Sequence, residues 1–297
     1  RFWHKVLYDC GLVSTPEPFR RLVHQGMILG ISYRDHRGAL VPNDKVVARD
    51  GRFFHADSNE ELEEFAAKMS KSLKNVVNPD DIIGRYGADA FRLYEMFMGP
   101  LEAEKPWRTE GVDGVSRFLH RAWKMIVGTD GEVSPQVQDA PMDRELERVL
   151  HQTIKKVGED YEGLAFNTAV SQLMIFVNAF SRCEVRNRRA MESFVQLLSP
   201  LAPHISEELW QRLGHAESIA YEPWPAYDEA KLQLDEVEVL VQLSGKPKVR
   251  LMMPADADAA AMERLALADA QVQQALAGKT VVKVVAVPGR LVNIIAR

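Results

Sequence analysis

The spacing of hydrophobic positions near the start of the chain predicts one helix and a short strand. Phe2, Val6 and Cys10 are four residues apart, as on one face of a helix. Residues 26–30 form an apolar run between two glycines, which is typical of a short buried strand. Polar, hairpin-like sequence follows through Phe54. This region is therefore expected to mix α and β structure.

The next part of the chain predicts a loop and two short helices. An acidic run at 59–64 leads into a loop of lysine and serine at 68–72. Asn78, followed by proline and two aspartates, is a typical helix start. A second helix is expected over 88–98, because the Gly-Pro pair at 99–100 ends it. The two helices would form a compact unit directly behind the loop.

Helical spacing of apolar residues then recurs through the middle of the chain. Between residues 112 and 214 the apolar positions repeat every three or four residues, as on the buried faces of packed helices. This recurrence predicts an antiparallel helix bundle. The expected helical segments are 115–126, 146–157, 170–177, 194–198 and 205–213.

Near the C-terminus the period changes from helical to alternating. A loop rich in proline and aromatic residues at 221–227 marks the expected boundary. Alternation on both sides of a Ser244-Gly245 turn predicts a β-hairpin. An alanine-rich helix and a second hairpin turning at Pro288-Gly289 follow, so the tail is expected to be a small ββαββ domain. The segments are 237–243, 249–253, 258–277, 280–287 and 291–295.

Composition excludes several classes of protein. The formal net charge of −5 argues against bulk electrostatic coating of nucleic acid, although local basic patches remain compatible with it. Cys10 and Cys183 form no CxxC or Cys/His cluster, and the eight histidines show no ligand spacing, so no metal site is expected. With no membrane span or signal pattern, we expect a soluble, cytoplasmic protein. The first helix has no Met and no N-cap residue before it, which indicates entry into a longer protein.

The strongest chemical signal is the loop Lys68-Met69-Ser70-Lys71-Ser72. Two ammonium groups three positions apart, among small hydroxyl residues, can close over a polyphosphate as compact point charges. A lysine that reaches the phosphates only in the transition state would raise the rate rather than the affinity. Taken alone, the pentapeptide favours a solvated surface loop, and the sequence around it reverses that preference.

The sequence around this loop resembles a known family. The run KMSKSLKNVVNPDDIIGRYGADAFRLY is similar to the second signature of class I aminoacyl-tRNA synthetases and the stem-contact helices behind it. The flanks GMILGISYRDHRGALVPNDKV and MFMGPLEAEKPW resemble bacterial leucyl-tRNA synthetases, as do VQLSGKPKVRLMMPADAD and VVKVVAVPGRLVNII near the end. The isoleucyl, valyl and methionyl enzymes share the loop but differ in these flanks.

The resemblance implies an architecture and a reaction. The end of a Rossmann-type α/β catalytic domain is expected over 1–72, a stem-contact helical unit over 73–111, an all-α anticodon-binding-type bundle over 112–232 and a small α+β tRNA-binding domain over 236–297. The reaction is the ATP-dependent attachment of leucine to tRNA(Leu) through leucyl-adenylate, by an enzyme that is monomeric when full length. Lys71, supported by Lys68, would stabilise the departing pyrophosphate. ATP would contact Lys68, Met69, Ser70, Lys71 and Ser72, and Mg2+ would accompany it.

Departures from the family pattern leave alternatives open. The chain has no His-x-Gly-His motif, no editing domain and no zinc insertion, so we expect it to be inactive by itself. Pro247 stands where the family has a residue with a backbone N–H, which puts the local strand pairing in doubt. One rival is a tRNA-binding module without chemistry. Another is a synthetase for a different branched amino acid, because the amino-acid pocket would lie before residue 1.

Other charged and aromatic residues mostly favour structural roles. Asp89 and Arg92, one helical turn apart, are expected to form an ion pair or a cap rather than touch substrate. Trp210 and Trp224 are expected to pack rather than stack on bases, and His204 to lie in a first helical turn. The arginines 182, 186, 188 and 189 fit a solvated loop or a phosphate contact equally well. Strand alternation would place Lys246, Lys248 and Arg250 on one solvent face, where they could meet the tRNA elbow.

Overall fold

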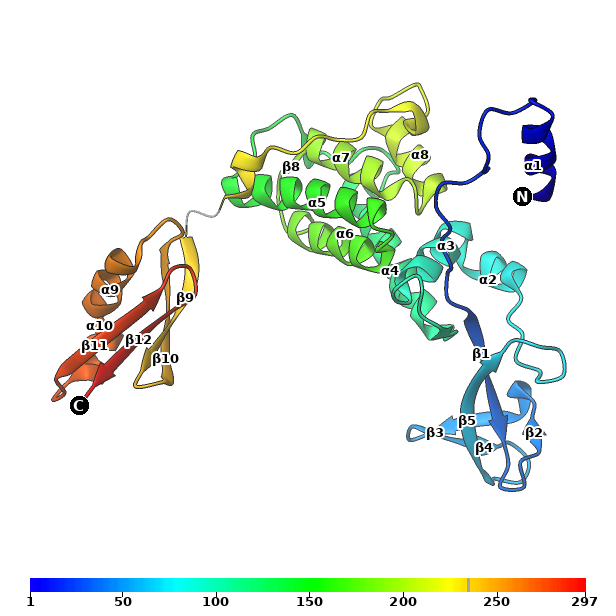
Figure 1. The fold of residues 1–297 in the computed structure, drawn as a ribbon, viewed down its shortest axis with the longest axis horizontal. Helices are drawn as coiled ribbons and strands as arrows, with labels where there is room; N and C mark the ends of the chain where they lie inside the picture. Colours follow the sequence, from blue (N-terminus) through cyan, green and yellow to red (C-terminus); the bar gives the residue numbers. More distant parts are fainter. Residues whose placement is uncertain (234–235) are drawn as a thin grey trace. The chain divides into compact units, whose positions relative to one another are not determined.

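The computed structural model describes residues 1–233 and 236–297, which form two compact units (Figure 1). Unit 1 comprises Arg1–Tyr227 and unit 2 comprises Asp228–Arg297. Each unit has a hydrophobic core made of its own residues. The expected mixed α/β class is confirmed. Among the described residues, no helix is both long enough and apolar enough to span a lipid bilayer.

The N-terminal part of unit 1 holds one helix and a largely antiparallel sheet. The expected first helix is present as α1 (Phe2–Asp9). The strand expected at 26–30 begins later and runs further, as β1 (Ile28–Arg34), and a 3₁₀ turn occupies Asn43–Lys45. The sheet order is β2 (Leu40–Val41), β1, β5 (Glu61–Lys68), β4 (Arg52–His55) and β3 (Val46–Arg49), and β6 (Lys105–Pro106) pairs with β1 in parallel.

Strand β5 takes up most of the acidic run, whose sequence pattern predicts no element. Leu62 is buried, whereas Glu61 and Glu63 face solvent, so the strand alternates between the two faces of the sheet. Glu63 lies opposite Arg34 of β1 and forms an ion pair with it at 2.5 Å. The sequence pattern did not predict this strand because acidic residues, which are uncommon in strands, occupy its exposed positions.

Two short helices and a five-helix bundle complete unit 1. The Asn78 side chain caps α2 (Pro79–Tyr86) by accepting a hydrogen bond from the Asp80 N–H, as its sequence predicts. Gly87, with φ of 89°, links α2 to α3 (Ala88–Phe97). The bundle consists of α4 (Glu110–Ile126), α5 (Arg144–Glu162), α6 (Phe166–Phe180), α7 (Arg188–Leu198) and α8 (Pro203–Arg212). A two-residue pairing joins β7 (Val137–Gln138) to β8 (Arg186–Asn187), and Ile219–Tyr221 form a 3₁₀ turn.

Three stacked phenylalanines lie in the core of the bundle. Phe176 lies between Phe180 and Phe194, with ring centroids 4.2 and 5.0 Å apart, and all three are fully buried. Burying a phenylalanine side chain contributes roughly 2–3 kcal/mol. The same core continues through α3, where Leu93 is fully buried. The short helices behind the lysine-serine loop are therefore packed into the bundle.

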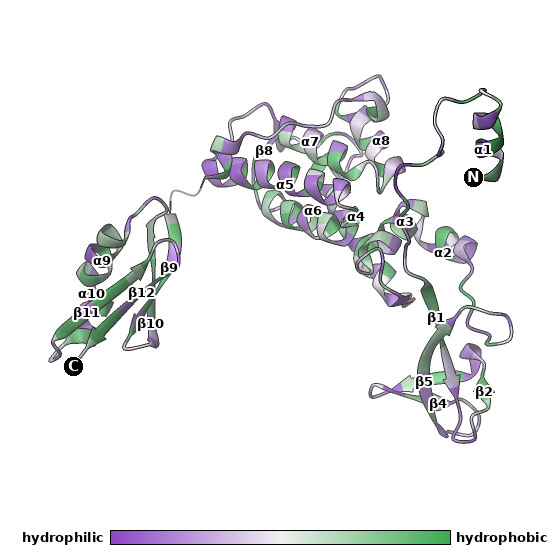
Figure 2. Cartoon of the chain, viewed as in Figure 1, coloured by the Kyte–Doolittle hydropathy of each residue, from purple (hydrophilic) through white to green (hydrophobic). Residues whose placement is uncertain are grey.

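Unit 2 has the ββαββ order that its sequence predicts. Its strands are β9 (Glu236–Leu243), β10 (Lys246–Pro254), β11 (Val281–Val287) and β12 (Leu291–Ala296), after a 3₁₀ turn at Glu229–Leu232. The sheet order is β10-β9-β12-β11, with β9 and β12 parallel, and its strands are strongly hydrophobic (Figure 2). The single helix expected at 258–277 is divided into α9 (Ala259–Ala268) and α10 (Ala270–Leu276), because Asp269 caps the second helix.

Candidate functional site

The lysine-serine loop begins at the end of a central strand and leads into α2. Lys68 is the last residue of β5 and pairs with Leu29 of β1, so its backbone is held by the sheet. Met69 is partly buried against the helical core. Lys71 and Ser72 are exposed. The motif is thus anchored at one end and projects its second lysine into solvent.

A local hydrogen-bond network shapes the loop. The Ser70 N–H donates to Asn75 Oδ1 at 2.8 Å, and the Leu73 N–H donates to Ser70 Oγ at 3.2 Å. The hydroxyls of Ser70 and Ser72 lie 3.1 Å apart. Lys74 adopts a left-handed backbone conformation with φ of 51°, and its N–H donates to the Lys71 carbonyl at 3.3 Å. The loop's own hydrogen bonds therefore give it a defined turn conformation.

The lysine ammonium groups in and beside the loop are accessible to an anionic ligand. Lys68, Lys71 and Lys74 are exposed, and nothing in ranges 1–233 and 236–297 forms an ion pair or hydrogen bond with their ammonium groups. A lysine ammonium that has no internal carboxylate partner is suited to a phosphate. Both motif lysines are thus exposed, Lys68 at the end of β5 and Lys71 in the loop that follows it.

Asp89 connects α3 to the last helix of the bundle. Its buried carboxylate accepts hydrogen bonds from the N–H groups of His204 (3.3 Å) and Ile205 (2.7 Å), and from His204 Nδ1 at 2.8 Å. Asp89 therefore caps the N-terminus of α8, where a negative charge is favourable. His204 lies in the first turn of that helix, as expected. The cap foreseen for Asp89 is present, on a helix that begins 114 residues later (203 minus 89).

Arg92 does not pair with Asp89. Its guanidinium donates to the carbonyls of Leu201 (3.2 Å) and Pro200 (3.0 Å), just before α8 begins. Of the two structural roles expected for this pair, the cap is confirmed and the ion pair is not formed, because both side chains reach across to the same distant segment. Together Asp89 and Arg92 tie α3, behind the loop, to the bundle.

Arg186 is neither solvated nor available to a phosphate. It is buried, and its guanidinium donates to the carbonyls of Phe180 (3.1 Å), Met125 (2.9 Å) and Ser181 (3.4 Å). Both alternatives considered for the arginine cluster are therefore wrong at this position. Arg188 donates to the Leu213 carbonyl at 3.0 Å, whereas Arg182 and Arg189 are exposed. The sequence alone could not show which of these four arginines is buried, because that depends on which helix ends surround each side chain.

In unit 2 the expected single face of three basic residues is not formed. The strand register shifts between Pro247 and Val249, so a bulge interrupts the alternation. Lys246 lies opposite Leu243, on the side of the sheet that faces the core, whereas Arg250 lies opposite Leu240. Arg250 also forms an ion pair with Glu238 at 3.2 Å. The doubt that Pro247 raised about the pairing is confirmed, and the expected common face is wrong.

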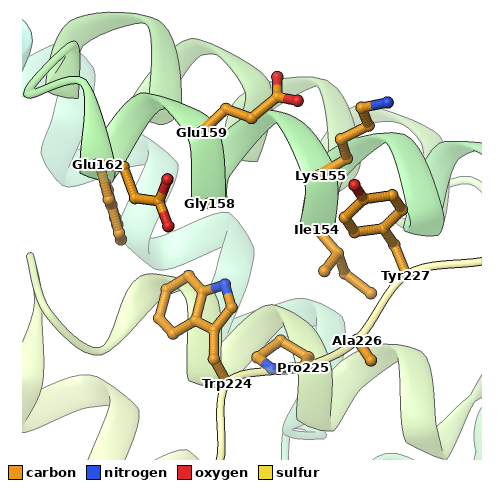
Figure 3. A pocket seen from close by; sticks show the side chains of 10 residues that line it. Ile154, Lys155, Gly158, Glu159, Glu162, Trp224, Pro225, Ala226 and Tyr227 are labelled. Atoms are coloured by element: carbon orange, nitrogen blue, oxygen red, sulfur yellow. The ribbon is translucent and has the colours of Figure 1, made fainter.

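Trp210 and Trp224 occupy different environments. Trp210 is buried and stacks on His215 with ring centroids 3.6 Å apart, so its expected packing role is confirmed. Trp224 packs against Tyr161, with centroids 5.6 Å apart, but keeps 45% of its surface exposed. It lines a cavity of 560 Å3 between α5 and residues 224–227 (Figure 3). In the described part of the chain, no group of three or more His, Cys, Asp or Glu residues is placed to hold a metal.

Two protein-family models and a solved structure match this chain. Residues 62–106, which contain the loop and the helices behind it, match the family model of class I tRNA synthetases (I, L, M and V). Residues 143–263 match the model of the anticodon-binding domain of tRNA ligase. Among solved structures, the chain is similar to Agrobacterium radiobacter agnB2 LeuRS in a ternary complex with tRNA and LeuAMS. The TM-score is 0.65 at 28% sequence identity, and the match covers 100% of this chain and 36% of that one.

Proposed function

We propose a function from the premise that this chain is of the class I tRNA synthetase type and resembles the C-terminal portion of a leucyl-tRNA synthetase. It supplies the phosphate-binding loop and tRNA-binding regions of a leucine–tRNA ligase. The observation that carries the proposal is the exposed pair Lys68 and Lys71, on a loop that lies within the class I match. Because the chain spans 36% of the matched synthetase, the activity belongs to the larger enzyme.

In the proposed reaction, leucine carboxylate attacks the α-phosphate of ATP. The bond to the bridging oxygen breaks, leucyl-adenylate forms and pyrophosphate leaves with the negative charge that develops. Lys71, with Lys68 in support, stabilises that charge, and Met69, Ser70 and Ser72 complete the ATP-binding loop. Mg2+ bound to ATP would neutralise part of the charge on the phosphate oxygens. The 2′-hydroxyl of the terminal adenosine of tRNA(Leu) then attacks the leucyl carbonyl, so that an ester to the tRNA forms, the bond between the leucyl carbonyl and the phosphate oxygen breaks, and AMP leaves.

The remaining helices and unit 2 are proposed to bind tRNA(Leu). The match to an anticodon-binding domain and to a synthetase crystallised with tRNA supports this role. The whole enzyme is proposed to act as a cytoplasmic monomer. Its net charge of −5 in this portion means that tRNA contacts would come from local basic groups such as Arg182 and Arg189, not from a basic surface.

The proposal is tested by supplying the preceding catalytic residues, either in one polypeptide or in trans. We expect ATP–pyrophosphate exchange that depends on leucine. Isoleucine, valine and methionine at equal concentration should support little exchange, and the same mixture without this chain should support none. Exchange with another of these amino acids would reassign the substrate. No exchange with any of them, together with retained tRNA binding, would favour a module that performs no chemistry.

A second test concerns tRNA. We expect this chain to bind tRNA(Leu) with an affinity that falls about 10-fold or more between roughly 50 and 200 mM salt, because only phosphate neutralisation by local cations is available. Deleting residues 236–297 should weaken binding further. The deletion leaves the core of unit 1 intact, since the two cores share no residues. Filter binding measures both effects, and unchanged affinity after the deletion would exclude unit 2 from the interface.

A further inference from the structure

A buried asparagine lies at the base of the lysine-serine loop. Asn75 is 2% exposed, although it lies only four residues after Lys71 in a segment that is mostly solvent-accessible. Its Oδ1 accepts the Ser70 N–H at 2.8 Å, and its Nδ2 donates to the carbonyls of Ala67 and Lys68, each at 3.4 Å. One side chain thus joins the end of β5 to the first turn of the loop.

The neighbouring strand is adapted to this side chain. Gly30 of β1 has no Cβ, and a Cβ built there would lie 2.3 Å from the Asn75 carbonyl oxygen and 2.7 Å from its Cγ. Real Cβ atoms do not approach other atoms so closely, so any larger residue at position 30 must displace Asn75. Gly30 pairs with Ala67 in the sheet, directly beside the carbonyls that Asn75 contacts. A central strand position without a side chain is otherwise unfavourable, which indicates close approach by another segment.

We infer that Asn75 is a positioning residue for the phosphate-binding loop, with Gly30 providing the space that it occupies; the inference rests on the function proposed above. By tying Ser70 to the end of β5, Asn75 fixes where the loop leaves the sheet. Lys68 belongs to the strand, whereas Lys71 lies beyond the tie. The backbone position of Lys71 relative to Lys68 is therefore constrained by this amide.

The amide group is specifically required at this position. The Ser70 N–H needs an acceptor, and the carbonyls of Ala67 and Lys68 each need a donor. A short side-chain amide supplies one acceptor oxygen and two donor hydrogens, whereas a hydroxyl has only one donor hydrogen. An aspartate has the same shape but would place a buried negative charge against two carbonyl oxygens. Asn75→Asp therefore changes the hydrogen bonding and leaves the volume nearly unchanged.

Asn75→Asp in the enzyme with its catalytic residues present is the principal test. We expect the turnover for leucyl-adenylate formation to fall on the order of 10-fold to 100-fold, since misplacing a catalytic group by about 1 Å has effects of this size. The KM for leucine and the transfer of leucine from preformed adenylate to tRNA should change little. Asn78→Asp is the matched control, because Asn78 only accepts a hydrogen bond and aspartate caps equally well.

Gly30→Ala should reproduce the effect by displacing Asn75, whereas Gly84→Ala should be silent because no atom lies within 4 Å of the added Cβ. The decisive readout is the double variant Asn75→Asp with Lys71→Ala. If Asn75 acts by positioning Lys71, the double variant should be no slower than Lys71→Ala alone. Multiplicative losses, or wild-type turnover in Asn75→Asp, would overturn the inference. Leucine-dependent exchange by the wild type supports the proposed function whatever the Asn75 variants show. If the wild type shows no such exchange, the proposed function itself is contradicted.

Discussion

Lys71→Ala is expected to lower the rate of leucine-dependent ATP–pyrophosphate exchange by a factor on the order of 10² to 10³, as for the loss of one preorganised charged donor. The ammonium of Lys71 is exposed on the loop, where it can meet a developing negative charge. The apparent affinity for leucine should change little, because no loop residue is proposed to touch the amino acid. The measurement is steady-state exchange with the preceding catalytic residues supplied.

The neighbouring lysines provide graded controls for Lys71. Lys68→Ala should act in the same direction but less strongly, because its backbone is held in β5 and it is proposed only to support the charge. Lys74→Ala should be nearly silent, since this exposed lysine lies past the motif. Similar losses of exchange rate in all three variants would indicate a loop that is merely basic.

The transfer of leucine from preformed adenylate to tRNA should survive Lys71→Ala, because pyrophosphate has already left. Near wild-type exchange in this variant would contradict the proposed role of Lys71.

Arg186→Met should lower the free energy of unfolding of unit 1 by about 3–5 kcal/mol. Methionine keeps much of the length and apolar surface of the side chain but has no donor. Three carbonyls near the C-terminal ends of α4 and α6 would then lose their hydrogen bonds inside the bundle. The cation also opposes the partial negative charge at those helix ends. Urea unfolding followed by circular dichroism measures the loss, since the bundle carries most of the helical signal.

Arg189→Met is the matched control for this prediction. Arg189 is exposed on the same short segment, so its replacement should change stability by less than about 0.5 kcal/mol. Arg186→Lys should cause an intermediate loss in the free energy of unfolding, because one ammonium cannot reach both helix ends as a planar guanidinium does. If Arg186→Met cost less than about 1 kcal/mol, the buried guanidinium would not be holding the helix ends together.

Elements encoded by neighbouring residues could be predicted from the sequence. Asn78 followed by Pro79 begins α2 because its side chain caps the N–H two residues later. Ser244 and Gly245 turn the first hairpin of unit 2 with φ of 48° and 82°, as a tight two-residue turn requires. The lysine-serine motif is also contiguous, so its five residues could be proposed as a site without any knowledge of the fold.

The tertiary structure decided which polar side chains are structural and what each one holds. Asp89 caps a helix that begins 114 residues later, counted from residue 89 to residue 203, and Arg186 joins the ends of α4 and α6. Gly30 makes room for Asn75, 45 residues further along the chain (75 minus 30). Spacing in the sequence reports which face of an element a residue occupies. Which distant backbone that face meets depends on how the elements pack, and a polar group in a packed interior is held by whatever donors and acceptors the packing brings to it.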